Sequence, residues 1–137
     1  MTTQKAIKIG NNLFVGISIL GLTSVSLLSL FNPQATMDLV RVSLTNNDAI
    51  SSIRGIYGGV GLTIVISLGY LLIHRAIVAV QFLTLFWFSY ALSRLITILV
   101  NGPLGGFGSQ WIIIESILFM LGATLLIFNR NLTYKQR

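Results

Sequence analysis

Three charged side chains interrupt the long apolar stretches of this 137-residue sequence: Arg54, Arg94 and Glu115. An ionisable side chain inside a membrane is costly unless it meets a partner, so such residues mark ligand sites, proton paths or fixed ion pairs. Arginine offers five donors in a planar fork that suits a carboxylate or a phosphate. Tyr57 follows Arg54 closely and adds a phenol. The chemistry indicated by these residues is therefore ion pairing or the binding of an anion.

Other chemistries find little support in the composition. The chain has no cysteine, which excludes disulfides, thiolate metal sites and thiol catalysis. One histidine and three acidic residues are too few to favour a metal site built by the protein. The serines lack the base and orienting acid that a nucleophile requires. The sequence predicts no catalytic residue, no metal and no cofactor, and an enzyme is the less favoured reading.

The hydrophobicity of the chain indicates an integral membrane protein. Hydrophobic residues make up 54% of it and charged residues only 9%, whereas soluble domains carry about 25% charged residues. The net charge of +6 could indicate a nucleic-acid partner. Most basic residues flank apolar runs, however, so membrane lipids are the expected partner and nucleic acid is not.

The apolar runs predict an all-α protein, an integral membrane four-helix bundle. About 20 residues suffice for a helix to cross the hydrocarbon core. We expect one transmembrane domain over residues 1–137, with spans at about 7–30, 49–73, 76–100 and 109–128. A short amphipathic helix over 33–47 should lie at the interface between the first two spans, because it begins with Pro33 and is too short to cross.

The distribution of basic residues predicts the orientation. In a four-helix chain both termini and the second connection share one side, and these segments carry six basic residues: Lys5, Lys8, Arg75, Arg130, Lys135 and Arg137. The other side carries Arg41, with Arg54 just inside the membrane. Lysine and arginine favour the cytoplasmic side, so both termini should be cytoplasmic, in a bacterial inner membrane or its equivalent.

The three intramembrane charges are expected at one depth. At 1.5 Å per residue, Arg54, Arg94 and Glu115 each lie roughly 7–10 Å below the outer boundary. We predict that they form one polar cluster with Tyr57 nearby, and that Arg94 pairs with Glu115. Arg54 then has two possible partners: an anionic, lipid-like ligand, or the carboxylate of Asp48. It could also extend to the interface.

The glycines after Arg54 predict close helix packing. Gly55, Gly58 and Gly59 would allow another backbone to approach, and the spacing of Gly55 and Gly59 matches a known packing motif. Packing inside the bundle and homodimerisation are both compatible with this pattern.

The block Arg54-Gly55-x-Tyr57-Gly58-Gly59, the later Arg94 and the loop Asn101-Gly102-Pro103 resemble a bacterial family of small four-helix membrane proteins, domain-of-unknown-function family 4345. Glu115, early in the fourth helix, fits the same order. The resemblance covers nearly the whole chain and implies the fold and the location of the site, but no activity. Family members often carry an acid two residues before the motif arginine, where this chain has Ser52, so no local ion pair is carried over.

Two functions follow as hypotheses. The first is a binding or accessory protein with a polar pocket near the outer membrane face, attached to a larger membrane complex, to a second copy of itself or to an anionic lipid-like ligand. The alternative is a membrane enzyme or redox helper that acts on a quinone- or lipid-like substrate, with Tyr57 and Glu115 moving protons. A transporter would require an oligomer, because the chain is too short for the usual internal repeats.

Overall fold

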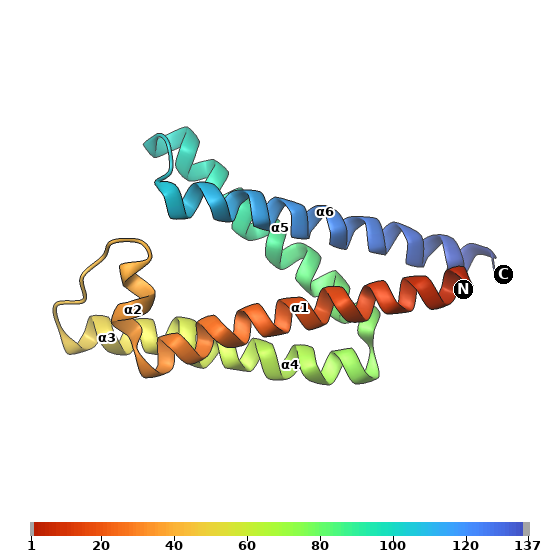
Figure 1. The fold of residues 1–137 in the computed structure, drawn as a ribbon, viewed down its shortest axis with the longest axis horizontal. Coiled ribbons are helices and arrows are strands. Elements are labelled where there is room, and N and C mark those ends of the chain that lie inside the picture. Colours follow the sequence, from red (N-terminus) through yellow and green to blue (C-terminus); the bar gives the residue numbers. More distant parts are fainter. Residues whose placement is uncertain (1, 136–137) are drawn as a thin grey trace. The chain divides into compact units, whose positions relative to one another are not determined.

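The fold is known from a computed structural model, which describes residues 2–135. Every regular element in this range is a helix (Figure 1). In chain order they are α1 (Thr3–Phe31), α2 (Pro33–Asp38), α3 (Asn47–Ile53), the π-helix η1 (Arg54–Val60), α4 (Gly61–His74), α5 (Ala76–Asn101) and α6 (Gly106–Lys135). Met1, Gln136 and Arg137, which belong to the termini predicted to be cytoplasmic, lie outside the described residues.

Four helices are long and apolar enough to cross a membrane, which confirms the predicted all-α membrane fold. They are Thr3–Phe31, Asn47–His74, Ala76–Asn101 and Gly106–Asn131. The first and last extend beyond the predicted 7–30 and 109–128, because helices satisfy their own backbone and continue past the hydrocarbon core. The second combines α3, η1 and α4 in one continuous helix.

The interfacial segment is shorter than predicted. Instead of a helix over 33–47, α2 ends at Asp38 and the chain turns through Arg41 at a φ of 59°. The side chain of Gln34 explains the turn: its amide nitrogen donates to the carbonyl of Val42 at 3.0 Å, and its oxygen accepts from the backbone N–H of Leu44 at 2.8 Å. These bonds draw the following segment back against α2.

The chain divides into two compact units. One contains residues 1–16 and 71–137, and the other contains Ile17–Tyr70. Helices α1 and α4 each contribute to both units. The prediction of a single domain stays a prediction.

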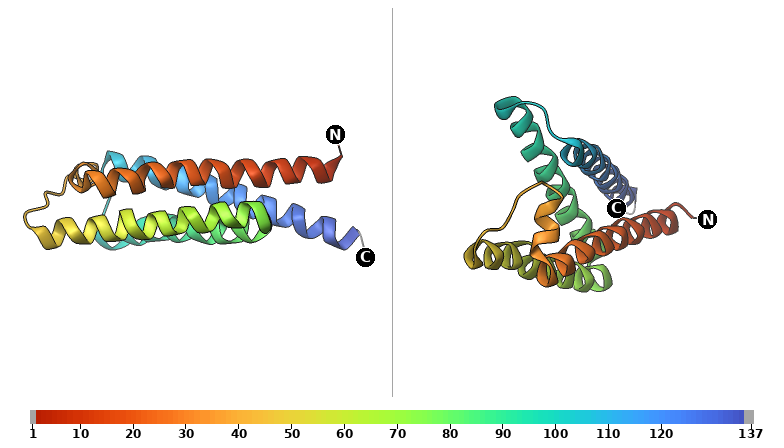
Figure 2. Two further views of the ribbon diagram at one scale, coloured as in Figure 1. Left: turned by 90° about the horizontal axis from the view of Figure 1, so that it is seen from below. Right: turned by 60° about the vertical axis from the view of Figure 1, so that its left-hand side comes forward.

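Helices α5 and α6 form the core of the first unit, joined by a short loop (Figure 2). Small residues allow their close approach. A Cβ added to Gly122 of α6 would collide with the hydroxyl of Thr84 on α5 and would lie 3.1 Å from the Phe14 ring. The rings of Phe88 and Phe119 also meet across the two helices, with centroids 5.2 Å apart. Helices α5 and α6 therefore pack closely at these residues.

In the second unit the start of the second span packs against the end of α1. A Cβ on Gly58 would lie 2.6 Å from Leu30, and one on Gly61 would collide with the hydroxyl of Ser26. Gly58 thus makes the predicted close contact. Apart from chain neighbours and the backbone of the same helix, no described heavy atom lies within 4 Å of a Cβ built on Gly55 or Gly59. Neither glycine contacts α1 in this unit, and the prediction that their face packs inward stays a prediction.

The π-helix explains the change of packing face. Residues four apart share a face in an α-helix, which is why Gly55 and Gly59 were expected to act together. Over Arg54–Val60 the backbone bonds run from i to i+5, so each turn holds more residues and the facing positions move along the sequence. The contact with α1 falls on Gly58 and Gly61 instead.

Candidate functional site

Arg94 and Glu115 form the predicted ion pair between α5 and α6. The Nε of Arg94 donates to one carboxylate oxygen of Glu115 at 2.7 Å, and Nη2 donates to the other at 2.9 Å. The side chain of Glu115 is 2% exposed and that of Arg94 is 20% exposed. Two parallel charge-assisted bonds are the strongest arrangement open to this pair. Both charges are balanced by each other.

An aromatic ring at the start of α6 also contacts the arginine. The guanidinium carbon of Arg94 lies 5.9 Å from the centre of the Phe107 ring. At this distance the face of an aromatic ring attracts a cation. Phe107 lies in turn 5.9 Å from Trp111, centre to centre. Arg94 is therefore held both by the carboxylate and by an aromatic ring, which restricts its freedom to bind anything else.

Arg54, in the second unit, forms a hydrogen bond to a backbone carbonyl. It is the first residue of η1, and its Nε donates to the backbone carbonyl of Leu30 at 2.8 Å. Leu30 lies in the last turn of α1, where backbone carbonyl groups have no N–H group of the same helix to accept a hydrogen bond from. A cation is favourable at this negative end of a helix. Arg54 thus caps the first span from the second.

The alternative acidic partner for Arg54 is not used. Among the described residues, Arg94 and Glu115 are the one pair of opposite charges whose nitrogen and oxygen atoms lie within 4.0 Å of each other. Asp48 therefore does not form an ion pair with Arg54. Tyr57, on the same π-helix, is 37% exposed. The guanidinium of Arg54 is thus anchored at one nitrogen, and no carboxylate of the described residues lies within ion-pair distance of it. The four-residue cluster of Arg54, Tyr57, Arg94 and Glu115 would join both units and stays a prediction.

A comparison with family models identifies the chain. Residues 11–126 match the model described as Domain of unknown function (DUF4345). The chain belongs to this family. No curated protein and no solved structure matches it. The DUF4345 match runs from Asn11 in α1 through most of α6, so it includes Arg54, Arg94, Glu115 and the π-helix.

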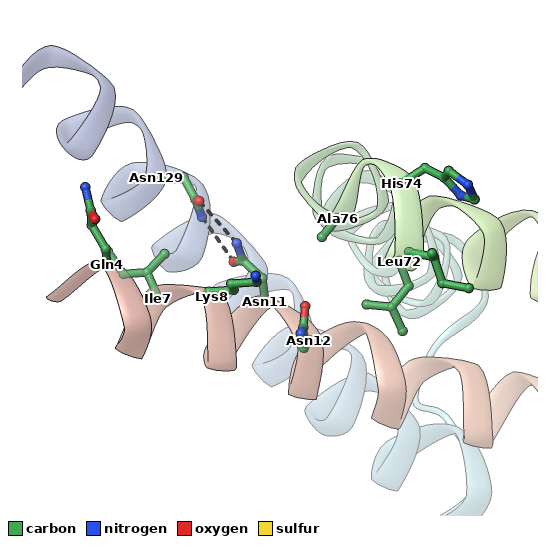
Figure 3. Close-up of a pocket in the computed structure, with 10 residues that line it drawn as sticks. Gln4, Ile7, Lys8, Asn11, Asn12, Leu72, His74, Ala76 and Asn129 are labelled. Atoms are coloured by element: carbon green, nitrogen blue, oxygen red, sulfur yellow. Dashed lines mark hydrogen bonds between the residues drawn. The ribbon is translucent and has the colours of Figure 1, made fainter. Parts of the chain in front are cut away.

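The sequence analysis of this DUF4345 member missed a polar cavity in the first unit (Figure 3). The cavity has a volume of about 420 Å³ and lies where α1, the end of α4, the start of α5 and the end of α6 meet. Its lining residues come from these four helices: Gln4, Ile7, Lys8, Asn11, Asn12, Leu72, Ile73, His74, Ala76 and Asn129.

A reciprocal amide pair forms one wall of this cavity. Asn11 and Asn129 exchange two hydrogen bonds of 3.1 Å each, and Asn129 also donates to the carbonyl of Leu125 at 2.7 Å. Asn11 is 6% exposed. A signal was present in the sequence, since two asparagines stand near the ends of spans that share one predicted side. Uncharged amides at helix ends are common, however, and the sequence gives no measure of which ones meet.

Proposed function

We propose that this DUF4345 protein is a membrane-embedded binding protein that holds the anionic group of a lipid-like ligand at Arg54. The observation that carries the proposal is the state of the Arg54 guanidinium. It is anchored through Nε to the carbonyl of Leu30, while no described carboxylate lies within ion-pair distance. A positive charge that is fixed in place and not neutralised is the arrangement that a phosphate or carboxylate binds best.

The anchoring bond supports the proposal because it limits the cost of binding. A free arginine side chain loses considerable rotational freedom when it grips a ligand. Here the contact with Leu30 has already fixed the orientation of the fork, so its terminal nitrogens can engage an anion with less further ordering.

The backbone around Arg54 also supports a binding role. π-helical turns are rare in proteins, and a large share of those that occur lie at functional sites. This one runs over Arg54–Val60 and carries both Arg54 and Tyr57. Tyr57 supplies a hydroxyl within the same segment and is exposed enough to reach a ligand. Gly55 and Gly59 leave open space along the helix, so an acyl chain or another helix can lie close to the backbone there.

The enzymatic alternative draws less support from the geometry. Glu115, its proposed proton donor or acceptor, uses both oxygens to bind Arg94 and is buried. Proton transfer requires a group within hydrogen-bond reach of the reacting atom. A carboxylate committed to a bidentate pair is better suited to fixing α5 against α6.

The proposal includes the cellular setting. The basic residues at both termini and in the connection between the second and third spans favour cytoplasmic termini in a bacterial inner membrane. In this orientation Arg54 would lie near the outer face. The ligand would then enter from the outer leaflet. A role as an accessory subunit or a homo-oligomer fits a chain of this size that binds but does not transform its ligand.

Native mass spectrometry of the full chain, released from nanodiscs of phosphatidylcholine containing some phosphatidylglycerol, tests the proposal. Arg54→Gln should lower retained phosphatidylglycerol about tenfold, because one charged hydrogen-bonding contact is lost. Arg41→Gln removes the same charge from the same unit and serves as the matched control. Equal retention by Arg54→Gln and Arg41→Gln would refute a site at Arg54. The same spectra report any second copy of the chain.

A further inference from the structure

We propose that the cavity between the ends of α1, α4 and α6 and the start of α5 is a second, independent site, which binds the phosphate of an anionic phospholipid headgroup. None of its lining residues belongs to the unit that contains Arg54. The argument rests on the charge and the polarity of the lining residues and on the volume of the cavity.

The charge of the lining favours an anion. Lys8 contributes an ammonium group, and none of the described lining residues is acidic. The surrounding chain strengthens this bias: Lys5 lies one turn before Lys8, and Arg75 directly precedes α5. A lysine or arginine close to a membrane surface attracts anionic lipid.

The helix ends at the cavity act in the same direction. Ala76, the first residue of α5, lines the cavity, and its N-cap residue Arg75 makes no side-chain capping bond. In the first turn of α5 the N–H groups of Val78 and Ala79 already donate to the carbonyl of Arg75, at 2.9 and 3.4 Å. The N–H groups of Ala76 and Ile77, together with the partial positive charge at the start of the helix, favour a phosphate beside the ammonium of Lys8.

The amides give the cavity a fixed wall. In Figure 3 the side chains of Asn11 and Asn129 meet between α1 and α6, next to Lys8. Their two reciprocal bonds hold both helices in register, and a Cβ on Gly10 would lie 3.0 Å from Leu125, so the helices approach closely here. A preformed wall means that a ligand does not have to order the cavity when it binds.

The apolar part of the lining indicates a lipid rather than a free ion. Ile7, Leu72 and Ile73 line the same cavity as the polar residues. Water-soluble phosphate gains nothing from them, whereas the glycerol and first acyl carbons of a phospholipid would bury apolar surface against them. A cavity of about 420 Å³ is large enough for a headgroup with its glycerol.

The test counts the phosphatidylglycerol molecules retained by the full chain from mixed phosphatidylcholine and phosphatidylglycerol nanodiscs. Both lipids carry a phosphate, but only phosphatidylglycerol has a net charge. Lys8→Gln should reduce retention at one site about five- to tenfold, and Lys8→Arg should keep it. Lys5→Gln is the matched control, because Lys5 is the neighbouring lysine on α1 but does not line the cavity; it should reduce retention less than about twofold.

The outcomes separate this site from the one at Arg54. Lys8→Gln and Arg54→Gln should each remove one bound lipid, and the double variant should remove both. Equal losses for Lys5→Gln and Lys8→Gln would overturn the proposal in favour of diffuse attraction to the membrane surface. Inorganic phosphate that displaces phosphatidylglycerol at matched affinity would overturn the assignment to a lipid. Ala76→Leu, which fills the cavity without altering its charge, should also lower retention, and unchanged binding would refute the location.

Discussion

The pair of Arg94 and Glu115 predicts a large coupling in a double-mutant cycle. The bidentate geometry, at 2.7 and 2.9 Å, means that each replacement by glutamine removes two charge-assisted bonds or converts them to weaker ones. Coupling energies between residues in contact are about 0.5–3 kcal/mol. Burial of the carboxylate should bring this pair to the upper end of that range.

The two single variants should differ in cost. Arg94→Gln leaves the carboxylate of Glu115 with 2% of its side chain exposed, and removing one partner of a buried pair costs about 3–5 kcal/mol. Glu115→Gln leaves a guanidinium that is 20% exposed, still lies on the Phe107 ring and can still donate to the new amide oxygen. We expect about 2 kcal/mol for it, close to one lost hydrogen bond to a charged group.

The double replacement should cost less than Arg94→Gln alone. Two glutamines can bond to each other, and no charge is left buried without a partner, so we expect about 2–3 kcal/mol in total. The coupling would then be about 3 kcal/mol. The free energy of unfolding can be measured by reversible titration with sodium dodecyl sulfate in mixed micelles.

A matched control uses Ser89→Ala and Thr124→Ala on the same two helices. Each hydroxyl bonds to a carbonyl of its own helix, that of Leu85 or Met120, so their effects should add. A coupling below about 0.5 kcal/mol for Arg94 and Glu115, or one no larger than that of the control, would refute the reasoning.

Three further predictions address packing and orientation. Gly61→Ala should destabilise the protein by about 1–3 kcal/mol, because the new Cβ would collide with a serine of α1. Gly59→Ala should be neutral or should stabilise the protein by up to about 1 kcal/mol, because the space beside Gly59 is open. Unfolding titrations that rank the two variants in the reverse order would contradict the π-helical register. Gly122→Ala should cost a similar 1–3 kcal/mol through its contact with a threonine of α5, and an unchanged unfolding midpoint would show that the helices can separate there. Gly106→Cys should react with a membrane-impermeant thiol reagent in intact cells and His74→Cys only in opened ones, and the opposite pattern would reverse the proposed orientation.

The features of the fold that depend on the composition of a whole stretch of residues could be predicted from the sequence. Each span follows from an apolar run of sufficient length, and the loop from Gly102 to Gly105 follows from glycine and proline. The pairing of Arg94 with Glu115 could be predicted from their common depth and from the short loop between their helices, because consecutive helices joined by a short loop are neighbours.

The parts that depend on local backbone geometry could not be predicted. The expectation for Gly55 and Gly59 assumed 3.6 residues per turn, which the π-helix replaces. The hydrogen-bond partner of Arg54 is the backbone carbonyl of Leu30. Every residue has such a carbonyl, so the sequence does not indicate which one accepts the bond. Asn11 and Asn129 are separated by 118 positions, and neither residue type identifies the other as its partner.

The π-helix also sets the rotational phase of the second span. Such a segment resembles an α-helix into which one residue has been inserted. Because the wide π turn takes up the extra residue, deleting one residue between Arg54 and Val60 would restore ordinary α-helical winding and leave Gly61 on nearly the same side of the helix. Winding all seven residues as an α-helix would instead rotate Gly61 and everything after it by about 100°, and Ser26 would then meet a different side of α4. The segment can therefore lose this one residue without a compensating change on the first helix, but at its present length it must keep the wide turn.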